Sequence, residues 1–309
     1  MSEIVICEFM DEAAVRDGLA GFDVHYDPKL VDRPDELRAR VADTRALIVR
    51  NRTQVRGALL EAAAKLEAVG RLGVGLDNID VEACRARGVA VFPATGANDV
   101  AVAEYVMGAA LHLRRGVFGA TDAMITGAWP REKLMGRELA DATLGLVGFG
   151  AIAREVARRA AAFGMAIVAH DPHVAAGDAR WGAVEPVALP DLLARADVIS
   201  LHVPLTDGTR NLIDTAALAR CKTDAILINS ARGGVVDEAA LAAALKAGRL
   251  GGAALDVFTQ EPLTPEGRAV FEGCPNLLLT PHVAGVTVES NIRVSHVTVA
   301  AVARHLRRG

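Results

Sequence analysis

The chain has 309 residues, of which 51% are hydrophobic and 4% aromatic, and its formal net charge is −4 at pH 7. This length predicts two domains, and so high an apolar content excludes an intrinsically disordered protein. The charge gives no general attraction to nucleic acid or to anionic membranes. No apolar run approaches the ~20 residues that a membrane span needs, so neither a membrane nor a nucleic acid is an expected partner.

The four cysteines are widely spaced and form no C-x-x-C pair; they are Cys7, Cys84, Cys221 and Cys274. We therefore expect neither a metal site nor a disulfide framework, and the cytoplasm is the expected location. The amino-terminal stretch "MSEIVICEFMDE" has no basic segment before its apolar residues, which is typical of a first strand and not of a secretory signal.

Short apolar runs alternate with helical patterns in the first third of the chain. Strands are predicted at "EIVIC", "ALIVR", "LEAVGR" and "VAVF", and helices at "DELRARVAD" and "GALLEAAAKL". This alternation predicts βαβ units and a parallel sheet. A second alternating series runs from "ATLGLVGFG" to "NLLLTPHVAG".

Two long helices mark the domain boundaries. The helix predicted at "NDVAVAEYVMGAALHLRRG" ends at Gly116 and has one apolar face, formed by Val102, Val106, Ala110 and Leu113. We place a domain crossing at this helix. The final helix, "VTVESNIRVSHVTVAAVARHL", is expected to return to the first domain and has one apolar side, formed by Val288, Ile292, Val299, Val302 and Leu306.

A glycine-rich turn follows the first strand of the second series. It matches G-x-G-x-x-G/A and opens a helix, through Gly148, Gly150 and Ala153. Such a turn lets a pyrophosphate approach the backbone, and the amides of Ala151 and Ile152 would face the phosphates. That helix has a predicted apolar face of Ile152, Val156, Ala160 and Phe163. Asp171, after the next strand, would bind the ribose hydroxyls of NAD and repel the 2′-phosphate of NADP, so NAD is the predicted cofactor.

Three ionisable residues follow later strands in turn: Arg232 in "INSARGGVVDE", Glu261 in "EPL" and His282 in "PHVAG". With "GFGAIA", "HDP", "LHVPLT" and "ALDVF" in the same order, they make the chain resemble the D-isomer-specific 2-hydroxyacid dehydrogenases over essentially its whole length. The resemblance implies an α/β fold of two doubly wound parallel-sheet domains, with a Rossmann cofactor domain (99–285) inserted in a flavodoxin-like substrate domain (1–98 and 286–309).

The resemblance also implies roles for these residues. Arg232 would bind the substrate carboxylate and polarise the C2 oxygen. His282 would be the acid/base, and Glu261 would orient its ring and favour its protonated form. Asp256 would meet the nicotinamide side of the cofactor. Further cofactor contacts are expected from Val203, Pro204, Ser230, Ala231, Arg232, His282, Val283, Ala284 and Gly285. Taken singly, such an arginine also suits a surface ion pair and such a histidine a helix cap. No catalytic role is expected for His112, His202 or His296.

A substrate loop is predicted at "VRNRTQV", beside the glycine-rich turn in "GRLGVGLDNID". The expected substrate contacts are Arg50, Arg52, Thr53, Val74, Gly75, Asn98, Arg232 and His282. Taken alone, the arginines of this loop suit a solvated surface. In this family the loop is expected to face the cleft, which suggests a second anionic group on the substrate.

The distal group of the substrate stays open between several chemistries. The motifs resemble the family branch that acts on 3-phosphoglycerate and, with the "EFMDE" opening, the branch that oxidises (S)-3-sulfolactate to sulfopyruvate. We favour the sulfonate. A glyoxylate or hydroxypyruvate reductase and a non-enzymatic, NAD-sensing protein of the corepressor kind are the alternatives. The complete set of Arg232, Glu261 and His282 argues against the last, and Glu261 argues against formate dehydrogenase, whose members have glutamine there.

The stretch "GAWPREKLMGREL" resembles the dimerisation arm of the family. Trp129 and Leu134 would be exposed apolar residues on a monomer, so a homodimer is predicted. The alternative is a surface loop that packs on its own domain. Whether Arg131 or Lys133 reaches the neighbouring active site is left open.

Overall fold

The computed structural model describes residues 2–308 and divides into two compact units. One unit comprises the chain up to Asn98 together with the residues from Val286, and the other comprises Asp99–Gly285. Each unit is built on one parallel β-sheet with helices on both faces.

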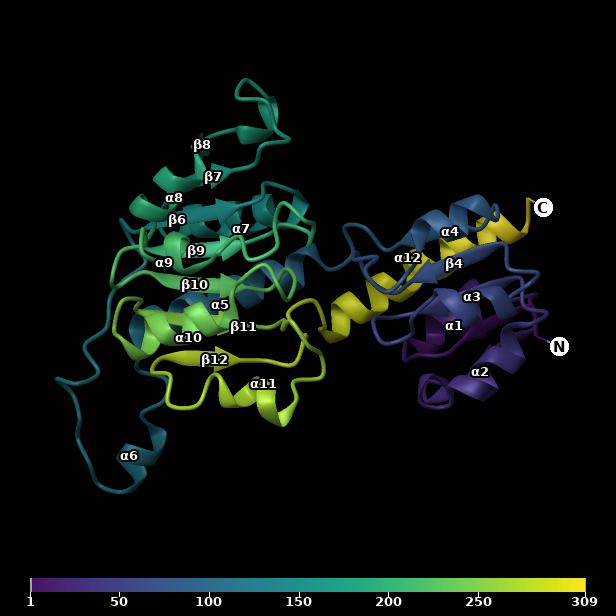
Figure 1. Ribbon diagram of the computed structural model, residues 1–309, viewed down its shortest axis with the longest axis horizontal. Helices are drawn as coiled ribbons and strands as arrows, with labels where there is room; N and C mark the ends of the chain where they lie inside the picture. Colours follow the sequence, from purple (N-terminus) through teal and green to yellow (C-terminus); the bar gives the residue numbers. More distant parts are fainter. Residues whose placement is uncertain (1, 309) are drawn as a thin grey trace. The chain divides into compact units, whose positions relative to one another are not determined.

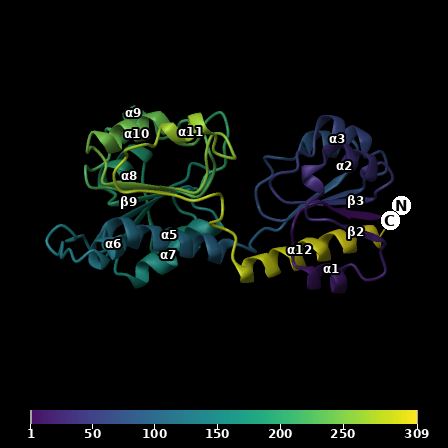
Figure 2. The same ribbon diagram turned by 90° about the horizontal axis from the view of Figure 1, so that it is seen from below.

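The sheet of the first unit has the strand order β2-β1-β3-β4-β5. Its strands are β1 (Ile4–Ile6), β2 (Val24–Tyr26), β3 (Ala46–Val49), β4 (Ala68–Arg71) and β5 (Ala90–Pro93). Its helices are α1 (Glu12–Gly18), α2 (Pro34–Val41), α3 (Gly57–Ala62), α4 (Val81–Ala86) and α12 (Val288–Leu306), with a 3-10 turn, η1, at Leu30–Asp32. Helices α1 and α12 cover one face, and α2 and α3 cover the other (Figure 2). Strand β2 is an addition to the predicted strands.

Helix α12 is amphipathic, but over a shorter length than its sequence predicts. Its start is fixed by a capping box, in which Thr287 and Ser290 exchange side-chain and backbone hydrogen bonds. Val299, Val302 and Leu306 are buried against the sheet, as predicted. Val288 and Ile292 are 76% and 40% exposed, so the prediction of a continuous apolar side is wrong for the first turns of this helix.

The sheet of the second unit has the order β12-β11-β10-β9-β6-β7-β8. Its strands are β6 (Thr143–Val147), β7 (Ala166–His170), β8 (Glu185–Pro186), β9 (Val198–Leu201), β10 (Ile226–Asn229), β11 (Gly252–Leu255) and β12 (Leu277–Leu279). Helices α5 (Asp99–Arg115) and α7 (Ala151–Ala162) lie on one face, opposite α8 (Leu189–Arg195), α9 (Thr215–Leu218) and α10 (Glu238–Lys246) (Figure 2). The remaining short helices are α6 (Thr121–Ile125), η2 (Ala179–Trp181) and α11 (Pro265–Ala269).

The two helices on the first face of this sheet form one core with it. The predicted apolar face of α5 is buried throughout, at Val102, Val106, Ala110 and Leu113. In α7, Val156 and Ala160 are buried and Ile152 is partly buried. Phe163 is 42% exposed, so its predicted place in this core is wrong. The reason is its position as the C-cap, where the chain turns away through Gly164 at φ +73°.

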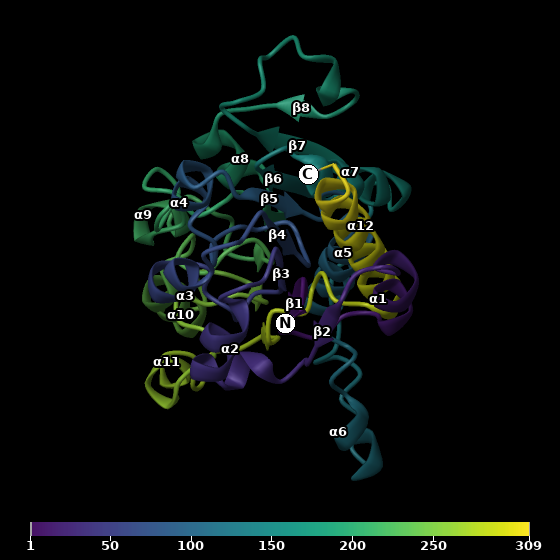
Figure 3. The same cartoon turned by 90° about the vertical axis from the view of Figure 1, so that its right-hand side faces the viewer.

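A segment between α5 and β6 leaves the body of the second unit. Figures 1 and 3 both show α6 and its flanking chain extending outward. Ile125, Trp129 and Met135 are between 76% and 87% exposed there. Trp129 is exposed as predicted, whereas Leu134 is half-buried and Met135 takes its place as the exposed apolar residue. We call residues 116–139 the arm.

Close packing of α12 on β4 depends on a glycine. A Cβ atom at Gly70 would lie 2.7 Å from Thr298 Cγ2 and 2.9 Å from Val302 Cγ2. We expect Gly70→Ala to lower the free energy of unfolding by about 1–3 kcal/mol, because the helix must move off the sheet. Urea unfolding followed by circular dichroism measures this change.

Gly108→Ala is the matched control. Gly108 is exposed within α5, and a Cβ there would meet nothing within 4 Å. The higher helix propensity of alanine should raise the free energy of unfolding by about 0.5–1 kcal/mol. Equal effects of the two substitutions would contradict the packing argument.

Candidate active site

The strand ends of the second sheet lie in one row. The last residues of five neighbouring strands pair in register, in the order Leu279, Leu255, Asn229, Leu201 and Val147. Strand β6 lies between β7 and β9, so the strand order reverses there. Ligands of open parallel sheets bind at the carboxyl edge beside such a reversal. The segments that follow these five strands and the neighbouring β7 contain all the predicted catalytic and cofactor residues of this unit.

The glycine turn after β6 has the shape that a dinucleotide needs. Gly148 has φ +88°, and a Cβ there would lie 2.6 Å from the carbonyl oxygen of His202. Gly150 is the N-cap of α7 and has no side-chain cap, and a Cβ there would meet nothing within 4 Å. The first amides of α7 are therefore left for an external acceptor, which the phosphates of NAD would supply.

Asp171 follows β7 and contacts this turn. Its Oδ2 accepts a hydrogen bond from the amide of Phe149 at 2.9 Å, and its Oδ1 accepts one from the amide of His173 at 2.9 Å. Both bonds fix the carboxylate beside the glycine turn. Each oxygen keeps a further lone pair for a ribose hydroxyl.

The turn after β10 is held by Asn229, a residue for which the sequence predicts no role. The Nδ2 of Asn229 donates to the carbonyl oxygen of Arg232 at 2.9 Å, and its Oδ1 accepts from the amide of Ala231 at 3.1 Å. The Oγ of Ser230 is buried without a hydrogen-bond partner in the part of the chain that the structure describes. A buried hydroxyl without a partner is costly, so this oxygen fits the predicted contact with a cofactor.

Glu261 and His282 form the predicted pair. His282 Nδ1 lies 2.7 Å from Glu261 Oε2, and Glu261 Oε1 accepts from the amide of Phe258 at 3.0 Å. Burial raises the pKa of the Glu261 carboxyl, but the hydrogen bond and charge of His282, the amide of Phe258 and the charge of Arg232 together lower it. The carboxylate is thus ionised at neutral pH and orients the imidazole.

Asp256 is the centre of the loop that contains His282. This aspartate is 1% exposed, and it accepts from the amides of Val283 and Ala284, each at 2.8 Å. Its backbone carbonyl accepts from the amide of His282 at 2.8 Å. Thr280 Oγ1 donates to it at 2.6 Å and lies 2.7 Å from the hydroxyl of Tyr105 on α5. Asp256 thereby positions His282, while its predicted contact with nicotinamide stays a prediction.

The predicted substrate loop of the first unit is ordered by Glu8. This carboxylate is 3% exposed and accepts from the amides of Arg50, Arg52 and Thr53 at 2.9, 3.2 and 3.0 Å. Asn78 donates from Nδ2 to the carbonyl oxygens of Arg50 and Thr53. Neither Glu8 nor Asn78 is among the residues predicted from the sequence, although "EFMDE" places an acid two residues after the end of β1.

The two arginines of this loop differ. The Arg50 side chain is buried, lies 3.9 Å from the centroid of the Phe9 ring, and donates to Asn291 Oδ1 at 2.9 Å. Burial lowers the pKa of Arg50, and the charge of the nearby Glu8 acts in the opposite direction. Arg52 is exposed and pairs with Asp32 at 2.5 Å. Arg50 is therefore the stronger candidate for binding an anion.

The remaining predicted substrate residues flank the next strand ends of the first unit. Val74 and Gly75 are half-buried, and the Oδ1 of Asn98 is buried without a hydrogen-bond partner within residues 2–308. Arg71, at the end of β4, was not predicted. It is 9% exposed, and Gly73 leaves its guanidinium room, because a Cβ there would lie 2.0 Å from Arg71 Nη1.

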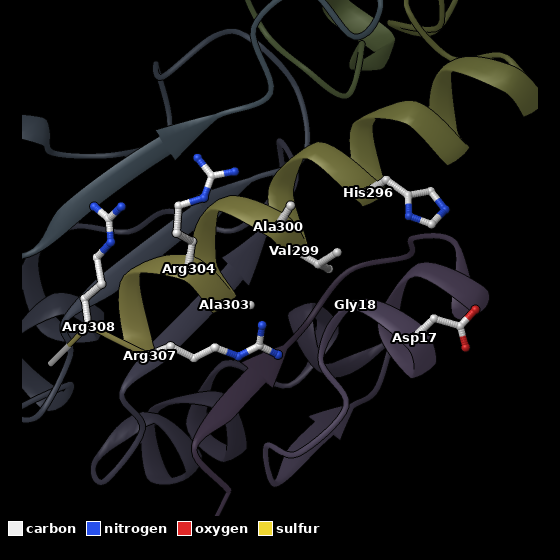
Figure 4. A pocket seen from close by; sticks show the side chains of 9 residues that line it. All are labelled: Asp17, Gly18, His296, Val299, Ala300, Ala303, Arg304, Arg307 and Arg308. Atoms are coloured by element: carbon white, nitrogen blue, oxygen red, sulfur yellow. The ribbon is translucent and has the colours of Figure 1, made fainter.

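A hollow of about 600 Å³ lies between α1 and α12, away from these strand ends. Figure 4 shows that Arg304 and Arg308 point away from Arg307, so their charges do not converge on one ligand. Within residues 2–308 no cluster of acids, histidines and cysteines could hold a metal ion, and no helix is long and apolar enough to span a membrane.

Residues 107–284 match the family model described as D-isomer specific 2-hydroxyacid dehydrogenase, NAD binding domain. The chain belongs to this family. It is an NAD-dependent 2-hydroxyacid dehydrogenase, and the predicted fold class and cofactor are confirmed.

Two relatives bear on the substrate. The chain is 56% identical over 307 residues to an (S)-sulfolactate dehydrogenase of Chromohalobacter salexigens, and the match covers 99% of each chain. It is 44% identical over 265 residues to a D-3-phosphoglycerate dehydrogenase of Mycobacterium tuberculosis. That match covers 85% of this chain and 50% of the relative, so the chain spans about half the length of that enzyme.

Two solved structures share the fold. The TT0316 protein from Thermus thermophilus has a TM-score of 0.87 and is 33% identical, with 99% of this chain and 97% of that chain covered. D-Lactate dehydrogenase from Aquifex aeolicus, complexed with NAD and lactic acid, has a TM-score of 0.84 and is 26% identical, with 99% and 96% covered.

Loss of the carboxylate at Glu261 should impair the acid/base without unfolding the protein. We expect Glu261→Gln to lower kcat/KM about 100-fold, because a neutral amide does not stabilise the charged imidazole that forms during oxidation. His282→Gln should cost at least as much. Steady-state assays with circular dichroism as a folding control measure both, and a near-normal Glu261→Gln enzyme would contradict the pairing.

Because His202 is half-buried, we expect the free energy of unfolding to fall in acid. Burial lowers the pKa of His202 to about 4 from its ordinary 6.5, and its Nε2 lies 2.9 Å from Ser200 Oγ. The unfolded chain binds this proton below pH ~6.5 while the folded chain stays neutral, so stability falls as pH drops from ~6.5 to ~4, by up to about 3 kcal/mol.

His202→Gln should remove this part of the acid sensitivity, because glutamine does not titrate. Urea unfolding of both proteins at pH 7 and at pH 4.5 measures the difference. An identical loss of stability in the two proteins would show that His202 is not its source.

Proposed function

We propose that this dehydrogenase interconverts (S)-3-sulfolactate and sulfopyruvate. During oxidation, hydride leaves C2 for NAD⁺ and the hydroxyl proton passes to His282 Nε2, which gives the 2-oxo acid, NADH and a proton. The observation that carries the proposal is the match over the whole chain to an (S)-sulfolactate dehydrogenase.

The proposal gives each site residue a task. His282 is the acid/base, Glu261 holds its ring from Nδ1, and Arg232 binds the C1 carboxylate through its fork of donors. The turn at Gly148 and Gly150 binds the pyrophosphate of NAD. The substrate domain is the first unit and the cofactor domain the second.

The charge of the substrate loop supports a sulfonate. Arg50 is desolvated and stacked on Phe9, whereas Arg52 is paired with Asp32 at the surface. The loop therefore offers one buried guanidinium, together with Thr53, to the distal group. A sulfonate has one negative charge and a phosphate ester is mostly dianionic near neutral pH, so one guanidinium matches the sulfonate better.

3-Phosphoglycerate oxidation is the second candidate. It is favoured by the 44% identity to a D-3-phosphoglycerate dehydrogenase and by a second buried arginine, Arg71, at the neighbouring strand end. Two guanidiniums would suit a dianion. The two candidates share all the chemistry at C2 and differ only in the distal group.

We also propose that the protein is a cytoplasmic homodimer. The exposed Ile125, Trp129 and Met135 on the arm support a second copy, since their apolar surface is otherwise open to water. The four cysteines are free, which is typical of a reducing compartment.

Oxidation of NADH by the purified protein tests the substrate, with sulfopyruvate, phosphohydroxypyruvate, hydroxypyruvate and glyoxylate compared side by side. We expect the highest kcat/KM with sulfopyruvate. A preference for phosphohydroxypyruvate would replace the proposal by the second candidate. Turnover with none of the four would contradict the proposed reaction.

Substitutions of two arginines distinguish binding of the C1 carboxylate from binding of the distal anionic group. Arg232→Ala should lower kcat/KM at least about 100-fold for every substrate, because all share the C1 carboxylate. Arg50→Gln should raise KM for sulfopyruvate about 10- to 100-fold and leave glyoxylate, which has no distal anion, nearly unchanged. Arg56 is exposed, and Arg56→Gln is the control, which should change the KM for neither sulfopyruvate nor glyoxylate. Equal effects of Arg50→Gln on both substrates would contradict its role.

A further inference from the structure

The segment after β7 is held against the glycine turn by the stacking of two aromatic rings, Trp181 and Phe149. Trp181 is 6% exposed and stacks on Phe149, with 4.7 Å between ring centroids and 16° between ring planes. The indole Nε1 donates to the carbonyl oxygen of Ala175 at 2.8 Å. Phe149 lies between the two glycines of the turn and donates its amide to Asp171. The position of the segment relative to Asp171 is thereby fixed.

This anchoring brings a cation to the ribose side of the turn. Arg180 precedes Trp181, and its guanidinium is held by Asp178, with Nε to Oδ1 at 2.9 Å and Nη2 to Oδ2 at 2.6 Å. The hydrogen bonds from Arg180 lower the pKa of Asp178 to about 2. The hydrogen bond and the charge of Asp178 are the main causes that raise the pKa of Arg180. The charge of Asp171 also raises this pKa, so the two side chains interact electrostatically.

A second cation borders the same turn. Arg154, on the first turn of α7, donates from Nη1 to the carbonyl oxygen of Phe149 at 3.3 Å. Its charge also acts on Asp178. Asp171 and Arg154 thus contact the glycine turn directly, and the Asp178–Arg180 pair lies within range of their charges.

We propose that Arg180 is a latent 2′-phosphate ligand, and that two carboxylates keep the enzyme selective for NAD. Asp171 would repel the 2′-phosphate of NADP, and Asp178 occupies the arginine that could otherwise bind it. An exposed ion pair such as Asp178–Arg180 is weak, so a phosphate can take over the guanidinium once Asp171 is neutral. The inference rests on the proposed contact between Asp171 and the cofactor ribose.

Direct binding of NADH and NADPH, measured by nucleotide fluorescence on the full-length protein, tests the inference. Asp171→Ser should strengthen NADPH binding at least about 10-fold relative to wild type. Adding Arg180→Gln to that variant should weaken NADPH binding about 10-fold and leave NADH binding unchanged. Adding Asp178→Asn instead should strengthen NADPH binding a further few-fold, because it releases Arg180.

Arg195→Gln in the Asp171→Ser background is the matched control. Arg195 pairs with Glu185 in the same unit through two bonds of 2.8 and 2.6 Å, so its loss removes an equal charge at another place. It should not change NADPH binding by more than about 2-fold. Asp171→Asn, whose single carbonyl oxygen can still accept from one of the two amides of Phe149 and His173, repeats the test if the serine variant is unstable.

The outcomes separate this inference from the site on which it rests. Normal NADH binding with equal effects of Arg180→Gln and Arg195→Gln on NADPH would overturn the role of Arg180 alone. A wild-type protein that does not bind NADH would overturn the proposed cofactor site and this inference with it. The ratio of kcat/KM for NADPH to that for NADH should follow the binding data.

Discussion

The in-register row of strand ends in the second sheet is the constraint on which the proposed chemistry depends. In a parallel sheet every strand ends at the same edge, so residues far apart in sequence become neighbours there. Five strands from β6 to β12 end in one row of paired residues. The glycine turn, Arg232, Glu261 and His282 all follow these ends. None of them needs a long excursion of the chain to reach the others.

The same hydrogen-bond arrangement orders several of the loops that follow the strand ends. A buried acid or amide at or near a strand end accepts backbone amides of the loop: Glu8 for residues 50–53, Asn229 for residue 231, and Asp256 for residues 283–284. Loop amides lack the partners that a sheet or helix would supply, and a carboxylate binds several of them at once. These hydrogen bonds order the loops without a ligand, which would lower the cost of orienting a substrate.

The elements that could be predicted are those with a strong local pattern. Long helices such as α5 and the apolar strands follow directly from the periodicity, and the ordered motifs identify the glycine turn and the catalytic pair. Residues whose role is to hold backbone could not be assigned in the same way. Glu8 and Asn78 act on a loop distant in sequence. Their partners become visible only when β3 lies between β1, which Glu8 follows, and β4, which Asn78 follows. Strand β2, three half-buried residues at a sheet edge, has too short a pattern to detect.

Electrostatics divides the site residues into two kinds. Glu261 and Asp256 act by fixed contacts, in which a carboxylate is satisfied by protein donors and holds other groups in place. Arg50 would act differently in its proposed role. Burial removes water from its guanidinium, and its direct contacts with Phe9 and with the amide oxygen of Asn291 supply no formal charge, although the charge of Glu8 also acts on it. An anion that reaches it gains a strong interaction in a medium of low dielectric constant. Arg52 and Arg180 each pair directly with a carboxylate, whereas the side-chain hydrogen bonds of Arg50 go to uncharged oxygens. Selectivity for one anion over another then follows from which arginines are already paired, and not from how many arginines the sequence contains.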